Sequence, residues 1–159
     1  MEGSADARGM HVALVVSRYN DFVTDRLQAG AFAALVAAGA SRDDIVVIRV
    51  PGAFEVPLAS KRAAESGRFD AIVCLGCLIR GETPHFDYIA SAASHAIAQA
   101  SLATGVPMSF GILTTNSAEQ AIARAVDGPA NKGWEAALAA VEMASLYRRF
   151  EAVAGGSRE

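Results

Sequence analysis

The segment at residues 76–88 carries groups that could bind an anion and move a proton, and it reads Gly-Cys-Leu-Ile-Arg-Gly-Glu-Thr-Pro-His-Phe-Asp-Tyr. Thr83 could cap a helix, and Pro84 suits the first helical position because the N–H that it lacks has no helical partner there. The backbone N–H groups of residues 81–83 could then converge on a phosphate at the positive end of the helix dipole. His85 follows in the first turn, where the dipole disfavours another positive charge, so we expect a neutral imidazole that can transfer a proton.

The same residue types also fit an ordinary connection between a strand and a helix. Such a connection with a capping threonine needs no chemistry, and His85 could be a surface residue. Arg80 lies beside the loop and could pair with a carboxylate, so we expect it to support the loop rather than to react. The residues alone leave both interpretations open.

Cys74 and Cys77 form a C-x-x-C pattern, which can indicate a redox or a zinc site. Within a strand, positions three apart point to opposite faces and lie about 10 Å apart, which is beyond the reach of a disulfide. A second pair of ligands that could complete a zinc site is missing from the sequence. We therefore predict two buried thiols and no metal site.

Four continuous apolar runs predict strands that are buried on both faces, because a half-buried strand would alternate polar and apolar residues. They cover residues 11–16, 45–50, 71–79 and 108–113. Helical patterns follow these runs at about 20–38, 54–66, 84–104 and 132–150. Asn20 is expected to be the N-cap of the first helix. Asn116 or Ser117 is expected to cap a further short helix that precedes the last one.

Strands that alternate with helices imply parallel pairing through right-handed crossovers. We therefore predict an α/β fold, a three-layer sandwich with a central, mainly parallel four-stranded sheet flanked by helices on both faces. Ligands of such sheets bind beyond the carboxyl ends of the strands. The loops at Tyr19, Phe54, residues 80–85 and Thr114 all follow strand ends, so they should lie along one edge of the sheet.

The composition indicates one domain over residues 1–159, with a poorly ordered arm at 1–9 and a polar tail at 151–159. Fourteen basic and seventeen acidic residues give a net charge of −3 without a basic run, so nucleic acid is not an expected partner. Charged residues interrupt every long apolar run, which argues against a membrane span. The N-terminus lacks the basic start and apolar core of a signal peptide, and we expect a cytoplasmic protein.

Five blocks of the sequence share a known order. Besides residues 76–88, they are Ser-Arg-Tyr-Asn-Asp at 17–21, Val-Pro-Gly-Ala-Phe-Glu at 50–55, Phe-Gly-Ile-Leu-Thr-Thr at 110–115 and Asn-Lys-Gly at 131–133. Together they resemble the 6,7-dimethyl-8-ribityllumazine synthase family of riboflavin biosynthesis. The resemblance covers roughly residues 10 to 150. Five blocks in the family's order are far more specific than one motif.

The resemblance implies a transferase that condenses 5-amino-6-(D-ribitylamino)uracil with 3,4-dihydroxy-2-butanone 4-phosphate, with loss of phosphate and water. The pyrimidine's own amine attacks the ketone, so no metal and no organic cofactor is expected. The protein would hold the two substrates in line, anchor the phosphate and move protons.

The resemblance also assigns the site residues. His85 would be the proton donor. Those facing the pyrimidine and ribityl groups would be Tyr19, Ala53, Phe54, Glu55, Cys77, Leu78, Ile79 and Phe110. Those at the butanone phosphate would be Glu82, Thr83 and Arg124.

Phe110 and Arg124 match positions that family members contribute from a neighbouring subunit. Without the resemblance, Phe110 would be interpreted as a core residue of a strand and Arg124 as part of a solvated helix face. Lys132 matches a position near the site, and its role stays open. The chain departs from the family just before it, where Val-Asp-Gly-Pro-Ala stands at 126–130 in place of the frequent Gly-Thr-Lys-Ala-Gly.

The resemblance implies a homo-oligomer with shared sites, namely a ring of five subunits that can close into a sixty-subunit icosahedral shell, and riboflavin synthase as a candidate partner. Two other functions also fit a member of this family. One is a flavin- or lumazine-binding protein without catalysis, and the other is a structural shell protein with a vestigial site. Retention of Thr83, His85 and Arg124 together favours the enzyme.

Overall fold

The four apolar runs form one parallel sheet in the computed structural model, which describes residues 1–155. The strands are β1 (Val12–Ser17), β2 (Ile45–Val50), β3 (Ala71–Ile79) and β4 (Met108–Thr115), in the order β2-β1-β3-β4. Every residue of the inner strand β1 is buried, as a strand covered on both faces requires. The expected four-stranded sheet is confirmed, and it is parallel throughout.

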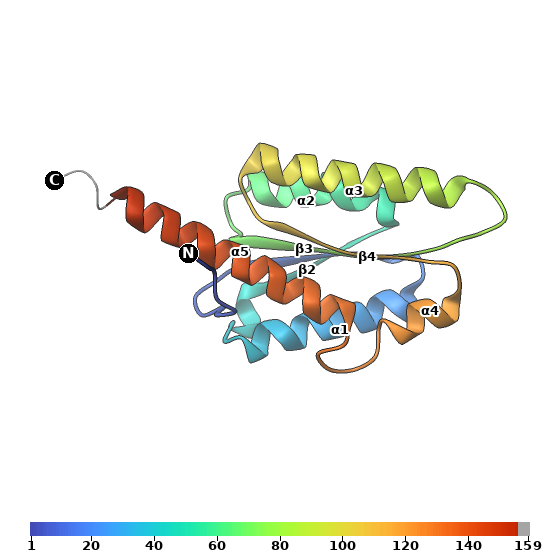
Figure 1. Ribbon diagram of the computed structural model, residues 1–159, viewed down its shortest axis with the longest axis horizontal. Coiled ribbons are helices and arrows are strands. Elements are labelled where there is room, and N and C mark those ends of the chain that lie inside the picture. The colour runs from blue at the N-terminus through green and yellow to red at the C-terminus, as the bar shows by residue number, and fades with distance from the viewer. Residues whose placement is uncertain (156–159) are drawn as a thin grey trace.

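Helices cover both faces of the sheet (Figure 1). On one face lie α2 (Val56–Glu65) and α3 (His85–Thr104); on the other lie α1 (Asp21–Ala37), α4 (Ala118–Ala123) and α5 (Lys132–Gly155). Two short 3-10 helices, η1 (Arg42–Asp44) and η2 (Ala53–Glu55), precede β2 and α2. The expected three-layer sandwich is therefore confirmed.

Alternate residues of β1 contribute to two separate cores. Val12, Leu14 and Val16 pack with buried residues of α1 and α5, whereas Ala13 and Val15 pack with those of α2 and α3. This division follows from the period of two in a strand, which sends successive side chains to opposite faces. Both helix layers are thus fixed to the sheet that carries the loops of the site.

Asn131 joins the start of α5 to α1. Its side-chain oxygen accepts hydrogen bonds from the N–H groups of Gly133 (2.8 Å) and Trp134 (3.2 Å), and its amide donates to the carbonyl of Arg26 (3.1 Å). A Cβ on Gly133 would overlap the carbonyl of Leu27, so glycine permits the close approach of the two helices. The Asn-Lys-Gly block therefore has a structural role that needs no ligand.

The expected start of α3 was wrong in detail, whereas the expected N-cap residue of α1 is confirmed. Thr83 does not cap α3, because the first helical N–H groups, those of Asp87 and Tyr88, donate to the carbonyl of Pro84, which makes proline the N-cap residue. Asn20 is the N-cap residue of α1, but its side chain makes no capping bond because its backbone is left-handed, at φ 63°.

The C-terminal helix is longer than the sequence suggested. The helix was expected to end at residue 150 and a polar tail to follow, yet α5 continues to Gly155, since Glu151, Ala152 and Ala154 are good helix formers. The end of α5 projects beyond the sandwich (Figure 1). Residues 156–159 of the expected tail lie outside the described part of the chain.

The N-terminal arm lies on its own chain. The N–H of Ala7 donates to the carbonyl of Ala38 at the end of α1 (2.8 Å), and the side chain of Ala7 is buried. Ser4 donates its N–H to the hydroxyl of Ser145 on α5 (3.2 Å). These contacts hold the arm without a neighbouring subunit. In residues 1–155, no helix combines the length and apolarity that crossing a membrane would require.

Candidate active site

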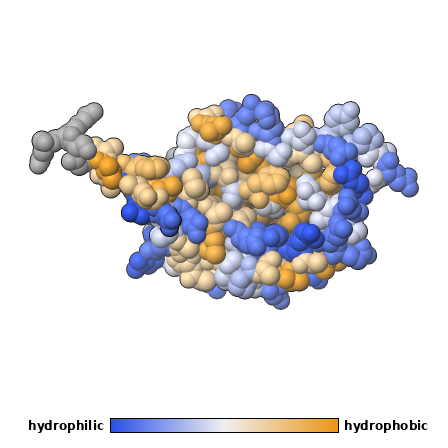
Figure 2. Space-filling model, viewed as in Figure 1, coloured by the Kyte–Doolittle hydropathy of each residue, from blue (hydrophilic) through white to orange (hydrophobic). Residues whose placement is uncertain are grey.

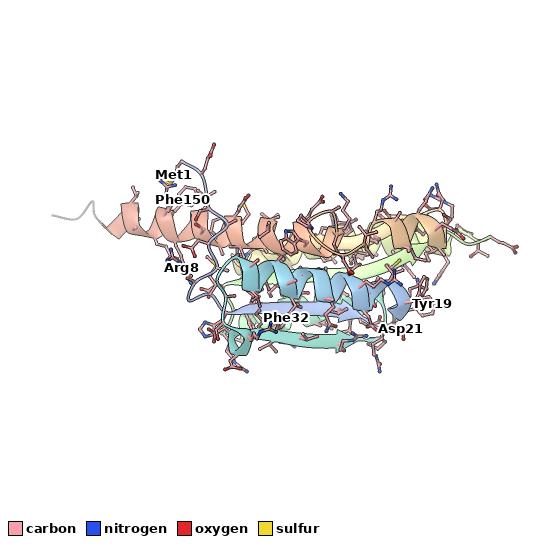
Figure 3. All side chains as sticks on the ribbon, turned by 90° about the horizontal axis from the view of Figure 1, so that it is seen from below. Met1, Arg8, Tyr19, Asp21, Phe32 and Phe150 are labelled. Atoms are coloured by element: carbon pink, nitrogen blue, oxygen red, sulfur yellow. The ribbon has the colours of Figure 1, made fainter. Side chains whose placement is uncertain are left out.

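A cavity of about 920 Å³ opens beyond the carboxyl ends of the strands, as the fold class predicts. Its walls come from the loops after β1, β2 and β3 and from the first turns of α3. Figure 3 shows Tyr19 and Asp21 at one end of the sandwich, with Met1, Arg8 and Phe150 at the other. The cavity, which Tyr19 lines, is therefore at the opposite end of the molecule from Met1 and Phe150.

Nine of the twelve expected site residues line this one cavity. They are Tyr19, Ala53, Phe54, Glu55, Cys77, Leu78, Ile79, Thr83 and His85. The structure brings them together from three loops that are more than twenty residues apart in sequence, because parallel strands end at the same edge of the sheet.

Backbone hydrogen bonds fix the loop after β1. The N–H groups of Arg18 and Tyr19 donate to the carbonyls of Val50 (2.8 Å) and Pro51 (3.1 Å), so this loop continues the pairing of β1 with β2. The ring of Tyr19 nevertheless points into solvent and is 72% exposed. The main chain is held while the ring stays accessible to a ligand.

Exposed aromatic rings surround the cavity. Phe54 is 63% exposed and Tyr88 is 73% exposed, and both line the cavity with Tyr19. Exposed apolar side chains that gather around one cavity often mark a binding site. Their flat faces suit a planar ligand that can stack.

The loop at residues 81–83 offers free donors. Within residues 1–155, none of these three backbone N–H groups has a hydrogen-bond partner, although the N–H of Arg80 just before them donates to the carbonyl of Thr115 (2.8 Å). The loop precedes the N-terminus of the twenty-residue helix α3. Free N–H groups at the positive end of a helix dipole suit an anion.

Arg80 supports the loop, as the sequence suggested. Its guanidinium donates to Asn116 (3.1 Å), contacts the carboxylate of Asp87 (3.4 Å) and lies 4.6 Å from the ring centre of Phe86. These contacts engage its guanidinium with three neighbouring side chains. The prediction that it pairs with a carboxylate is confirmed.

His85 is the first residue of α3 and is exposed to the cavity. Its imidazole makes no hydrogen bond or ion pair to any residue in the described range. A ring without a partner inside the protein can exchange protons with a bound substrate. Helical spacing places Tyr88, Ile89 and Ala92 on the same face of α3, and all three line the cavity. These three were not among the predicted site residues, although their spacing from His85 in the sequence indicates them.

Phe110 and Arg124 lie elsewhere. They line a second cavity of about 380 Å³ at the edge strand β4, together with Lys132 and Glu135. Phe110 is 47% exposed, and the guanidinium of Arg124 donates to the carbonyl of Gln120 (2.9 Å). Figure 2 shows apolar surface exposed on the face that carries β4 and α5. Glu82, the remaining expected residue, is exposed and does not line the first cavity.

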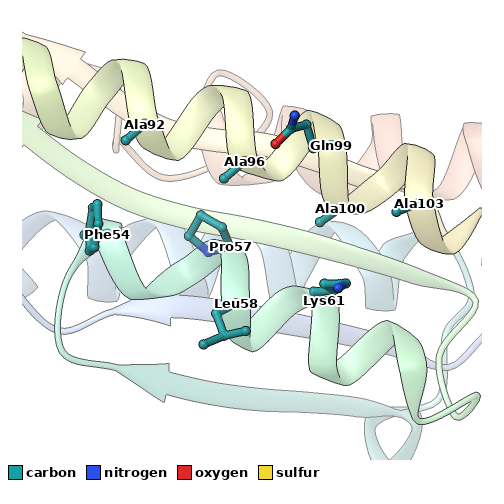
Figure 4. Close-up of a pocket in the computed structure, with 9 residues that line it drawn as sticks. All are labelled: Phe54, Pro57, Leu58, Lys61, Ala92, Ala96, Gln99, Ala100 and Ala103. Carbon is teal, nitrogen blue, oxygen red and sulfur yellow. The ribbon is translucent and has the colours of Figure 1, made fainter.

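A groove of about 480 Å³ continues from the first cavity between α2 and α3 (Figure 4). The two share Phe54 and Ala92. Ala92, Ala96 and Ala100 recur one turn apart along α3, and their small side chains leave this space above α2. Phe54 therefore forms part of the wall of both.

The two cysteines are buried residues of β3. They lie in the separate cores on opposite faces of the sheet, and neither forms a disulfide, as predicted. Burial raises the pKa of Cys74 to about 12 and that of Cys77 to about 11. No group of three or more potential ligands within residues 1–155 could hold a metal ion.

We expect Cys77 to react slowly with thiol reagents, although it lines the cavity. A thiol with a pKa of about 11 is ionised to only about 0.1% at pH 8, against roughly 10% for an ordinary thiol. The alkylation rate should therefore rise about tenfold per pH unit from pH 7 to 10. Mass spectrometry after timed maleimide labelling measures it, and a Cys77→Ser variant identifies the site. A rate that levels off below pH 9 would contradict the raised pKa.

Comparison with known proteins identifies the family. The model of the family described as 6,7-dimethyl-8-ribityllumazine synthase matches residues 9–148. A protein of that name from Desulfosudis oleivorans is 57% identical over 146 residues, which are 92% of this chain and 93% of the relative. Those from Syntrophus aciditrophicus and Desulfatibacillum aliphaticivorans are 54% and 50% identical over 93% and 95% of this chain, and over 96% and 97% of their own lengths. The chain belongs to the 6,7-dimethyl-8-ribityllumazine synthase family.

Proposed function

We propose that the protein condenses 5-amino-6-(D-ribitylamino)uracil with 3,4-dihydroxy-2-butanone 4-phosphate to 6,7-dimethyl-8-ribityllumazine, a step of riboflavin biosynthesis. The observation that carries the proposal is the cavity beyond the strand ends. It joins exposed aromatic rings, free backbone donors and an unpaired histidine in a chain that matches the family over residues 9–148.

The condensation requires no covalent bond between the protein and its substrates. The 5-amino group attacks the ketone, and water leaves as the imine forms. Phosphate then leaves from the butanone, and the second ring closes when the ribitylamino nitrogen attacks the remaining carbonyl and a second water is lost. Because the nucleophile belongs to the substrate, the protein contributes orientation, an anchor for the phosphate and proton transfer. The proposal requires no metal or organic cofactor.

The pyrimidine and its ribityl chain would occupy the part of the cavity between Tyr19, η2 and the end of β3. The ring of Tyr19 offers a stacking face, and residues 77–79 offer backbone groups to a uracil edge. The carboxylate of Glu55 can accept hydrogen bonds from sugar hydroxyls. It lies above Gly52, where a Cβ would come within 3.1 Å of it, so glycine leaves room for this side chain.

The butanone phosphate would bind at the loop of residues 81–83, including Glu82 and Thr83. The free N–H groups and the dipole of α3 support an anion there. His85 would then stand at the junction of the two substrates, where it can protonate the departing oxygen and take protons from the amine.

Phe110 and Arg124 would complete the site of a neighbouring subunit. They line a different cavity from the other residues, at an edge strand that is open to another chain. A guanidinium matches phosphate geometry through two parallel hydrogen bonds, and an exposed phenylalanine can cover the pyrimidine. Lys132 of the same cavity pairs with Glu135 (2.8 Å), so we assign it no role in binding.

Rings of five subunits are the assembly that we propose, because shared sites need a closed arrangement of copies. Closure into a sixty-subunit shell would depend on the connection between α4 and α5. This connection is short, with Gly128 at φ 90° and the N–H of Asn131 bonded to the carbonyl of Gly128 (3.0 Å). Negative-stain microscopy with light scattering distinguishes rings from shells. A cytoplasmic location and contact with riboflavin synthase stay predictions.

Incubation of the purified protein with both substrates tests the function directly. The expected result is the absorbance of the lumazine product, formed faster than in the same mixture without protein. A protein that binds lumazine without accelerating its formation would instead be the non-catalytic relative. Shells that neither bind nor react would indicate a structural protein.

We expect Arg124→Ala to raise KM for the phosphorylated ketone at least tenfold more than KM for the pyrimidine, because loss of a charge-assisted pair to phosphate costs about 1.5–3 kcal/mol. Phe54→Ala is the matched variant, since it should raise KM for the pyrimidine instead. Steady-state kinetics with each substrate varied in turn measures both constants. Equal effects on the two substrates would contradict this division of the cavity.

A further inference from the structure

Asn20 makes an unusual contact for a residue at a helix start. It is the one non-glycine residue with a positive φ in the described part of the chain, at φ 63° and ψ 46°. Asparagine adopts this left-handed conformation more readily than most residues. Its side-chain amide donates a hydrogen bond to the carbonyl of Cys77, 57 positions away, at 2.9 Å. A residue that normally caps its own helix is here bonded to another strand.

The carbonyl of Cys77 needs a donor from outside the sheet. Pairing between β1 and β3 stops at Val16 and Leu75, whereas β3 and β4 stay paired up to Ile79 and Thr115. Cys77 therefore stands beyond the point at which β1 can supply an N–H. A buried carbonyl without a donor is costly.

The alternation of backbone groups along β3 also indicates that the Cys77 carbonyl faces the side of β1. Ile72 and Arg80 both donate their N–H groups to the β4 side, to the carbonyls of Pro107 (2.9 Å) and Thr115 (2.8 Å). Backbone groups alternate along a strand, so the carbonyl of Cys77 faces the β1 side. The Asn20 amide thus supplies the hydrogen-bond donor that β1 no longer provides to the Cys77 carbonyl.

This hydrogen bond joins two walls of the cavity. Tyr19 precedes Asn20 on one wall, and Cys77 begins the other, which continues to Ile79. The main-chain bonds of Arg18 and Tyr19 reach only the β2 side. Among the described residues, Asn20 provides the hydrogen bond between the loop after β1 and the end of β3.

We propose that Asn20 is a positioning residue that sets the distance between the ring of Tyr19 and the end of β3, and so the affinity for the planar pyrimidine substrate. Asn20 also lines the cavity, but an N–H of its amide is bonded to the Cys77 carbonyl, and it acts through the two walls that this bond joins. The proposal rests on the placement of the pyrimidine between Tyr19 and residues 77–79.

The contribution of Asn20 to the start of α1 can be separated from its role in joining the two walls of the cavity. The first N–H groups of α1, those of Val23 and Thr24, donate to the backbone carbonyl of Asn20 (both 3.0 Å), not to its side chain. Replacing the side chain therefore leaves the start of α1 intact. Aspartate also tolerates a positive φ, and its charge suits a helix N-terminus, but its carboxylate cannot donate to a carbonyl.

Asn20→Asp is therefore the decisive variant. We expect it to raise KM for the pyrimidine about tenfold or more, because the two walls of the cavity are no longer joined. The unfolding temperature should fall by several degrees, because the buried carbonyl of Cys77 loses its donor. KM for the phosphorylated ketone should change less than about twofold, since the free N–H groups of residues 81–83 are untouched. The dissociation constant of the lumazine product, measured by fluorescence, should rise with KM for the pyrimidine.

Two further variants control the experiment. Asn20→Gly keeps the left-handed backbone and removes the tether without adding charge, so it should shift the same constants in the same direction. Gln28→Glu makes the same amide-to-carboxylate change on a half-buried side chain outside the cavity, which accepts a hydrogen bond from Arg49 (2.6 Å), and should leave both KM values unchanged. If Asn20→Asp does not fold, Asn20→Gly gives the answer.

A double variant tests whether Asn20 acts through Tyr19. If the tether serves to place that ring, Tyr19→Ala and Asn20→Asp together should raise KM for the pyrimidine by less than the product of their separate effects. Independent effects would overturn the proposal, as would wild-type KM values in both Asn20 variants or equal rises for the two substrates. Tyr19→Ala without any effect would instead refute the placement of the pyrimidine.

Discussion

Replacing His85 by alanine is expected to lower kcat roughly ten- to a thousandfold, because a positioned proton donor contributes about that much to a rate. The imidazole is exposed to the cavity at the first residue of α3. It has no partner among the described residues, so its removal should cost the fold little. Initial rates followed by lumazine absorbance give kcat. Circular dichroism and light scattering show whether fold and assembly persist.

The loss should stay incomplete, because the substrate amine reacts without help from a side chain and the cavity still holds both substrates. His95→Ala is the control. His95 lies on the same helix, is exposed and lines neither the cavity nor the groove beside it, so its loss should leave kcat unchanged. An unchanged kcat in His85→Ala itself would remove His85 from the mechanism.

The strands could be predicted closely because burial on both faces leaves a clear trace in sequence. The bounds of β2 and β3 agree with the predicted ones, and both begin and end where an apolar run meets a charged residue or proline. The end of α5 was missed for the opposite reason. Residues 151–155 form an exposed part of the helix with few buried contacts, so no apolar stripe marks where it stops.

The helix starts show what sequence cannot give. Asn20 and Thr83 are both good capping residues by type, yet neither side chain caps its helix. Whether such a side chain turns to its own helix depends on backbone torsions and on which other groups lack partners. The unpaired carbonyl of Cys77 is visible only once strand order and register are known.

Sequence could predict which residues come together at the site where these residues follow the ends of strands. Tyr19, Phe54 and His85 could be expected together because parallel strands bring their carboxyl ends to one edge. Phe110 and Arg124 carry no such signal in the sequence, and the resemblance alone marks them. Their separation from the main cavity follows from the position of β4 at the outside of the sheet, which the order of the strands along the chain does not reveal.

The separation of Arg124 from the cavity of His85 predicts a large gain of activity in rings that mix two variants. His85→Ala and Arg124→Ala subunits, each nearly inactive when the phosphorylated ketone is scarce, should recover activity when they assemble into the same ring. If His85 comes from one subunit and Arg124 from the next, random assembly of equal amounts leaves about a quarter of the sites with both residues intact. Co-expression with two affinity tags yields the mixed rings, and the rate per subunit is compared with that of each parent.

The positions of the residues in the two cavities supply the controls. Phe54 and His85 line the same cavity, so mixed rings of Phe54→Ala and His85→Ala subunits carry one defect at every site and should gain nothing. Phe110→Ala with Arg124→Ala should fail likewise, because both lie in the second cavity. Recovery only when one defect comes from each cavity would establish a site built by two subunits. Absence of recovery in the His85 and Arg124 mixture would mean that each subunit works alone, and the second cavity would then need another explanation.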